Sequence, residues 1–214
     1  MTIQQATLED MPMVEKVHAE CFPKDEHFTT LMGGGNNLTQ KMYEAYLQAE
    51  NLFLVAKDQD KIIGFCMGNM YNTKAMDIFY KNNTGTLLKR TLCLLIQGHP
   101  LVWKKVRDIV KTEWQKLKRK MTKTPEPQIT YLSDDINKPT ASLLSICVLS
   151  ECRGKGVSVA LFQSYEQLSK TRGVKAFTLA TWSGNTRGIA FYYKMGMRLR
   201  QHRGTYMQFI KDID

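Results

Sequence analysis

A basic, glycine-punctuated turn is the strongest chemical signal in the chain. An apolar run ends at Ile146-Cys147-Val148-Leu149, the turn reads Arg153-Gly154-Lys155-Gly156, and a helical pattern follows at once. Glycines let the backbone approach a ligand closely, while free N–H groups and the helix dipole at a helix start favour an anion. Arg153 and Lys155 add formal positive charge. The pattern predicts a phosphate site, more specifically a pyrophosphate site.

A second candidate block lies further along the chain. It starts at Asn185, carries the aromatic run Phe191-Tyr192-Tyr193, and ends at Gly196. The spacing predicts a helix over 185–195, with Gly196 in the position just past its end, where glycine accepts a left-handed backbone.

Hydrophobic periodicity predicts the helices and strands that surround these two blocks. Thr7 and Asp10 have the spacing of a capping box and predict the start of the first helix. The expected order is strand, helix, helix and a hairpin, then a helical region, then strand, helix, strand, helix and a second hairpin. This order predicts a mixed α/β sheet with helices on its faces. The expected strands are 2–6, 52–56, 61–68, 142–149, 176–181, 197–202 and 205–210, and the expected helices are 7–22, 39–48, 86–97, 101–121, 155–171 and 185–195.

Composition limits the class of protein. A chain of 214 residues can bury a full core as one domain. The sequence has no apolar run long enough to cross a bilayer, and its N-terminus lacks the pattern of a signal peptide. Five scattered cysteines predict buried free thiols in a reducing compartment, so a cytoplasmic location is expected. The four histidines show no metal-ligand spacing, and no metal is expected.

The two blocks together resemble the GNAT superfamily of acyl-CoA-dependent N-acyltransferases. The family's acyl-CoA signature, Gln/Arg-x-x-Gly-x-Gly/Ala, appears as Arg153-Gly154-Lys155-Gly156-Val157-Ser158, with Ser158 in place of the last small residue. The second block, 185–197, has Gly188 and Met197 where the family often has Ala and Phe. The opening segment Ile3–Pro12 is also similar. The resemblance covers the chain except about residues 70–139.

The resemblance implies direct acetyl transfer from acetyl-CoA to an amine, on a mixed, mostly antiparallel central sheet flanked by helices. Residues 1–214 would form one N-acetyltransferase domain, with a helical insertion at about 71–139 between the third and fourth strands. The fourth strand would part from its neighbour and bind the pantetheine arm, Asn185 would contact the pantetheine, and Tyr192 would protonate the departing thiolate. The implied cofactor-binding residues are Ile146, Cys147, Val148, Arg153, Gly154, Lys155, Gly156, Val157, Ser158 and Asn185.

Several assignments stay open at this point. Strand 142–149 has no carboxylate to act as general base, so Asp134, Asp135, the Asp25-Glu26-His27 run or a water chain are alternatives. Tyr192 also fits a packed aromatic. Cys147 and Cys152 flank the turn, and buried thiols are favoured over a covalent route. The acceptor is expected to be a small-molecule amine such as an amino sugar, with a polyamine-like metabolite or a protein N-terminus or lysine as alternatives.

The middle of the chain holds most of the net charge of +10, with roughly 14 basic against 6 acidic residues over 71–139. Helix 101–121 places Trp103 and Trp114 on an apolar side, where core packing is expected, and lysines opposite. The basic side of this helix fits a solvated surface, recognition of an acidic or phosphorylated substrate, or peripheral contact with a membrane. Nucleic acid is disfavoured as a partner because the sequence has no nucleic-acid-binding motif. The segment could also shape the acceptor pocket or a homodimer contact. A non-catalytic acyl-CoA-binding module docking through this helix is the alternative function.

Overall fold

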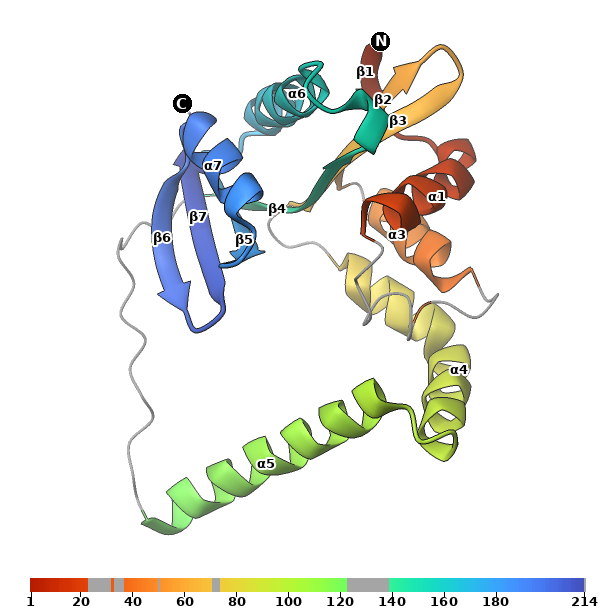
Figure 1. The fold of residues 1–214 in the computed structure, drawn as a ribbon, viewed down its shortest axis with the longest axis vertical. Coiled ribbons are helices and arrows are strands. Elements are labelled where there is room, and N and C mark those ends of the chain that lie inside the picture. Colours follow the sequence, from red (N-terminus) through yellow and green to blue (C-terminus); the bar gives the residue numbers. More distant parts are fainter. Residues whose placement is uncertain (23–31, 33–36, 50, 71–73, 123–138, 214) are drawn as a thin grey trace.

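A seven-stranded sheet carries helices on both faces in the computed structural model, which describes residues 1–22, 32, 37–49, 51–70, 74–122 and 139–213 (Figure 1). The strand order is β1-β2-β3-β4-β5-β7-β6, in which β4 and β5 run parallel and the other described neighbours run antiparallel. The strands are β1 (Thr2–Gln5), β2 (Leu52–Asp58), β3 (Lys61–Asn69), β4 (Thr140–Val148), β5 (Ala176–Trp182), β6 (Arg198–Arg203) and β7 (Tyr206–Asp212). The helices are η1 (Leu8–Asp10), α1 (Met11–Cys21), α3 (Leu38–Gln48), α4 (Ala75–Ile96), α5 (Pro100–Thr122), η2 (Ser150–Cys152), α6 (Val157–Thr171) and α7 (Thr186–Lys194).

The central strands separate two hydrophobic cores. In β2, Leu52 and Leu54 belong to the core beneath α6 and α7, while Phe53 and Val55 belong to the core beneath α1 and α3. Side chains alternate between the two faces of a strand, so a strand covered on both faces is apolar throughout. The mixed, mostly antiparallel sheet with flanking helices, as predicted, is therefore confirmed.

The first helix begins at the predicted capping box. The carboxylate of Asp10 accepts hydrogen bonds from the backbone N–H of Thr7 at 2.9 Å and from its hydroxyl at 3.1 Å. The same carboxylate is 2.6 Å from the Lys57 ammonium on β2. The cap thus fixes the start of the helix and ties it to the sheet.

A bulge in β4 opens the sheet at its centre. Met67 of β3 pairs with Ser145 and Gly68 pairs with Leu143, so Leu144 is an extra residue in β4. Pairing of β4 with β5 also stops at Leu143, although both strands continue. Because a bulge bends its strand and increases the local twist, the two strands part beyond this residue, as the family resemblance implied.

The helical region between β3 and β4 is longer than predicted. The helix expected over 86–97 begins at Ala75, because packing overrides the weak helix propensity of the polar stretch around Gly85. Phe79 and Asn83 are buried, and the Asn83 amide donates to the Phe79 carbonyl at 2.9 Å. The predicted break before α5 is confirmed, with Gly98 at φ +69°. The linker expected over 124–137 lies outside the described residues.

The described helices include none that is both long and apolar enough to cross a membrane.

Candidate active site

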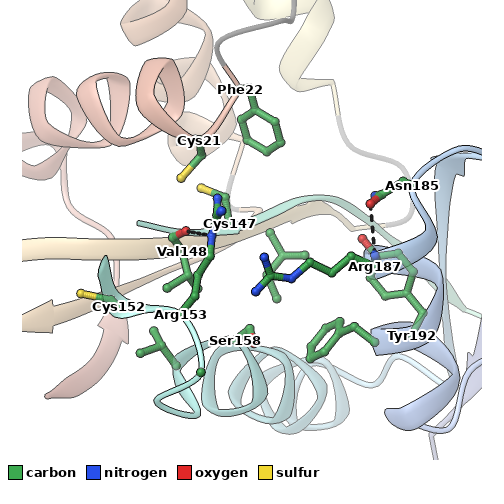
Figure 2. Close-up of a pocket in the computed structure, with 15 residues that line it drawn as sticks. Cys21, Phe22, Cys147, Val148, Cys152, Arg153, Ser158, Asn185, Arg187 and Tyr192 are labelled. Atoms are coloured by element: carbon green, nitrogen blue, oxygen red, sulfur yellow. Dashed lines mark hydrogen bonds between the residues drawn. The ribbon is translucent and has the colours of Figure 1, made fainter. Parts of the chain in front are cut away.

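A cavity of about 280 Å³ lies against the part of β4 that has left β5 (Figure 2). Its walls come from the end of α1, the last residues of β4, the end of η2 and the turn after it, the start of α6, and both ends of α7. The lining residues are Cys21, Phe22, Ile146, Cys147, Val148, Cys152, Arg153, Gly154, Val157, Ser158, Asn185, Arg187, Gly188, Phe191 and Tyr192.

The cavity brings together nearly all the residues singled out from the sequence. Those in its lining are Ile146, Cys147, Val148, Arg153, Gly154, Val157, Ser158, Asn185 and Tyr192. Lys155 and Gly156 are outside the lining and exposed in the adjoining turn. Two segments separated by the whole of α6 and β5 thus meet in one pocket.

The glycine turn has the geometry of an anion cradle. Gly154 has φ +78° and Gly156 has φ +81°, and a Cβ on either would meet no atom within 4 Å. Gly156 is the N-cap of α6, and no side chain caps this helix. The first N–H groups of a helix have no intrahelical acceptor and attract negative charge. The turn therefore leaves open space in front of backbone donors, which fits a diphosphate.

The same glycines explain a shift in the helix boundary. The sequence predicted a helix from Lys155, whereas α6 begins at Val157. A positive φ at Gly156 is incompatible with a right-handed helical turn, so the helix can start only after it.

Arg153 is held across the mouth of the cavity. Its Nε donates a hydrogen bond to the carbonyl oxygen of Val148, at 3.2 Å, which ties the turn to the end of β4 (Figure 2). Part of the backbone predicted to bind the pantetheine arm is thus already engaged by the protein. The rest of this arginine is exposed, so its charge remains available to an anion at the turn.

Asn185 caps α7 as well as lining the cavity. Its side-chain oxygen accepts from the N–H of Gly188 at 3.0 Å, and its Nδ2 donates to the Thr181 hydroxyl at 2.9 Å. The side chain thereby joins the end of β5 to the start of α7. A Cβ at position 188 would collide with this amide, which accounts for the glycine there.

Tyr192 is half-buried at the inner end of α7. Its ring packs edge-on against Phe191, with centroids 5.7 Å apart, and lies 5.9 Å from Phe209 of β7. Burial, with a smaller contribution from Cys66, raises the pKa of the phenol to about 12. The hydroxyl therefore keeps its proton at neutral pH and can donate a hydrogen bond to a group in the pocket.

Other lining residues were missed by sequence reasoning. Figure 2 shows the Arg187 side chain reaching from α7 into the cavity, and Cys21 and Phe22 reaching in from the end of α1. Arg187 follows Asn185 closely, so its place at the start of α7 was a usable signal. Cys21 and Phe22 have no local signal, because only the packing of α1 on β4 brings them near.

Cys21 and Cys147 form a thiol pair in the wall. A hydrogen bond from the Cys147 thiol, with a smaller contribution from the charge of Arg153, lowers the pKa of the Cys21 thiol. Burial raises the pKa of the Cys147 thiol well above its ordinary value. Of the predicted buried thiols, Cys93 is exposed on α4, so that prediction was wrong for this residue.

The candidates for the general base are not among the described residues. Asp25, Glu26, His27, Asp134 and Asp135 all lie outside the described residues. The described lining of the cavity contains no carboxylate and no histidine. Within the described part of the chain, no group of three or more His, Cys, Asp or Glu side chains could hold a metal ion.

The two tryptophans of α5 are not core residues. Trp103 is 53% exposed and Trp114 is 67% exposed. The expectation of core packing was wrong, because α5 packs on the end of α4 and otherwise extends away from the sheet (Figure 1).

Part of the chain that includes β4, α6, β5 and α7 matches a known protein family. Residues 124–197 match the model of the Acetyltransferase (GNAT) family. No curated protein matches the chain.

Solved structures share the fold across nearly the whole chain. The PaiA N-acetyltransferase of Thermoplasma acidophilum, in complex with coenzyme A, is 15% identical with a TM-score of 0.58, and 99% of this chain and 98% of that chain are covered. An N-acetyltransferase of Staphylococcus aureus is 12% identical with a TM-score of 0.58, covering 100% and 98%. The ribosomal-protein-S18-alanine N-acetyltransferase of Escherichia coli is 12% identical with a TM-score of 0.55, covering 100% and 94%. At these identities the likeness concerns the fold.

Proposed function

We propose that this chain, of which residues 124–197 match the Acetyltransferase (GNAT) family model, transfers the acetyl group of acetyl-CoA directly to the primary amine of a small-molecule or sugar acceptor. The observation that carries the proposal is the open glycine turn at the uncapped start of α6, which borders a cavity beside a parted strand. The related PaiA enzyme has coenzyme A bound, which supports the same donor here.

The donor would bind along the wall formed by α6 and β4. The N–H groups of residues 153–158 would hold the pyrophosphate, with Arg153 and Lys155 adding charge. The pantetheine arm would follow Ile146–Val148, where β4 lacks β5 as a partner. Asn185 would act mainly by fixing α7, since both ends of its amide already have protein partners.

The reaction needs one bond made and one broken. The neutral amine attacks the thioester carbonyl carbon, the C–S bond breaks, and the electron pair goes to sulfur. The amine nitrogen loses a proton to a base or to water, and the sulfur gains one as coenzyme A leaves. A backbone N–H aimed at the carbonyl oxygen would stabilise the charge that develops on it.

Tyr192 would assist the leaving sulfur. A thiol has an ordinary pKa of about 8.5, whereas the phenol has a pKa of about 12. The phenol therefore holds its proton more tightly, and its contribution would be a hydrogen bond that strengthens as negative charge grows on sulfur. A hydrogen-bond donor aimed at developing negative charge contributes on the order of 10²–10³-fold in rate.

The decisive experiment measures thiol release from acetyl-CoA with a panel of amines: an amino sugar, a polyamine and a peptide with a free N-terminus. The peptide belongs in the panel because one structural neighbour is an alanine N-acetyltransferase of a ribosomal protein. We expect turnover with the amino sugar or the polyamine. Turnover with the peptide alone would replace the proposed acceptor class.

Tyr192→Phe tests the role of the phenol. The variant keeps the ring and its packing against Phe209, so coenzyme A affinity and folding should be retained while kcat falls on the order of 10²–10³-fold. An unchanged kcat would make Tyr192 a packing residue. Binding of coenzyme A without acetylation of any amine would favour the alternative, a non-catalytic acyl-CoA-binding module.

We further propose that residues 1–214 form one N-acetyltransferase domain, with α4 and α5 as an insertion between β3 and β4. The continuous sheet from β1 to β6 supports this reading. A cytoplasmic location fits a protein whose five cysteines are free.

A further inference from the structure

We infer that α4 and α5 dock on the surface of an anionic lipid bilayer. The inference concerns a surface remote from the cavity and does not depend on acetyl transfer. Its basis is an exposed apolar stripe along α5 that is bordered by cations, together with further exposed apolar side chains near the end of α4.

The stripe consists of side chains at helical spacing. Trp103, Val110 and Trp114 are seven and four residues apart, which places them on one side of α5. Their exposed fractions are 53%, 62% and 67%. Exposed tryptophans on one side of an amphipathic helix are typical of helices that lie in a membrane interface.

No described element covers the stripe. Among the described elements, α5 makes an extensive contact only with α4, and Figure 1 shows it running away from the sheet. The Trp103 indole N–H donates to the Leu95 carbonyl at 3.2 Å, which fixes the corner between the two helices. Next to that corner, Ile96 is 86% exposed, and Leu92 and Leu88 are exposed one and two turns before it.

The charge beside the stripe selects an anionic surface. Arg107 lies one turn after Trp103, and Lys111 lies one turn before Trp114, so both border the stripe, with Lys104 close by. All three cations are exposed. Asp108 and Glu113, the acidic residues of α5, already interact with other groups. Cations flanking an apolar stripe match phosphate headgroups above acyl chains.

A second copy of the chain is the competing occupant. In a two-fold contact the same patch faces itself, so the cationic border of one copy would lie against the cationic border of the other. That repulsion favours the bilayer.

Vesicle co-sedimentation of the full chain without acetyl-CoA provides the test. We expect binding to phosphatidylcholine vesicles that contain about one-third phosphatidylserine, weak binding to phosphatidylcholine alone, and weakening as salt rises. Val110→Ser with Trp114→Ser should lower the partition coefficient about tenfold or more. Lys104→Gln with Arg107→Gln and Lys111→Gln should lower it on the order of 100-fold, at about fivefold per charge.

A matched control removes the same charge elsewhere. Lys16, Lys170 and Lys175 are exposed on other elements, and their triple replacement by Gln gives the same net charge. This variant should bind the vesicles far better than the α5 triple variant, with equal helical content by circular dichroism in both. Equal loss in both triple variants would mean bulk attraction and would overturn the inference.

Two further results would also overturn it. The first is a wild-type protein that fails to bind anionic vesicles. The second is a dimer in sedimentation velocity that dissociates in the Val110/Trp114 variant, which would make the stripe a contact between copies. Either result leaves the acetyltransferase proposal unaffected, because that proposal is read from thiol release.

Discussion

Gly156→Ala separates the cost of a left-handed backbone from the cost of blocking the anion cradle. Gly156 has φ +81° and its added Cβ would meet no protein atom. Folding should therefore lose only the conformational preference, about 1–2 kcal/mol, which lowers Tm by roughly 2–4 °C per kcal/mol in a chain of this size. Gly173 is a matched control, with φ +76° and equally open space, at the far end of α6.

Coenzyme A binding should distinguish the two variants. Gly156 lies in the turn proposed to hold the pyrophosphate, so a methyl group there should cost the complex one hydrogen bond to a charged group, about 1.5–3 kcal/mol, or on the order of 10- to 150-fold in Kd. Calorimetric titration should show this loss for Gly156→Ala, while Gly173→Ala binds like the wild type. Equal affinity of all three proteins, with matched stability losses in urea unfolding, would refute the assignment of the pyrophosphate to this turn.

Three further outcomes follow from the geometry. Asn185→Ala should destabilise the protein by about 1 kcal/mol in urea unfolding through loss of the α7 cap. Asn185→Asp should retain most of that stability, because aspartate can also accept the capping hydrogen bond. Equal losses in the two variants would show that the cap does not stabilise the protein. Iodoacetamide should modify Cys21 faster than Cys147, as followed by mass spectrometry of peptides, because the pKa of Cys21 is lowered while burial raises that of Cys147, and coenzyme A should slow the reaction. Burial alone raises the pKa of Asp10, but hydrogen bonds from Lys57 and Thr7 outweigh it and hold the pKa below its ordinary value; its stabilisation should be present above about pH 4 and lost as pH falls through the folded pKa. Asp10→Asn should flatten this acid limb of unfolding free energy against pH.

Most of the sheet could be predicted because the residues within each strand and its flanking turns carry a local sequence signal. The hairpin of β2 and β3, the glycine turn before α6 and the end of α7 at Gly196 are all set by residues next to one another in sequence. The start of α4 could not be predicted, since Phe79 and Asn83 are helical through burial rather than through propensity. The exposure of Trp103 and Trp114 was missed for a related reason. Periodicity shows that a helix has an apolar side but does not say what covers it.

The candidate site also has a part that could be predicted from the sequence and a part that could not. Its acetyl-CoA side lies in two contiguous blocks, so Arg153, Gly154 and Tyr192 could be identified from the two motifs and the family resemblance. Its remaining wall comes from Cys21 and Phe22, which meet β4 only through the packing of α1. Asn185 shows a different limit. The family resemblance implied a contact with the pantetheine, whereas the hydrogen bonds with Gly188 and Thr181 show that its side chain caps α7.

The bulge at Leu144 has a consequence for amide exchange. Only Thr140–Leu143 pair with β5, so the N–H groups beyond them that point towards β5 have no strand to protect them from solvent deuterium. Their neighbours on the β3 side remain paired up to Val148. Alternating fast and slow exchange along a single strand is therefore expected in the free protein. A bound pantetheine arm would slow the fast positions selectively, and that pattern would trace its path.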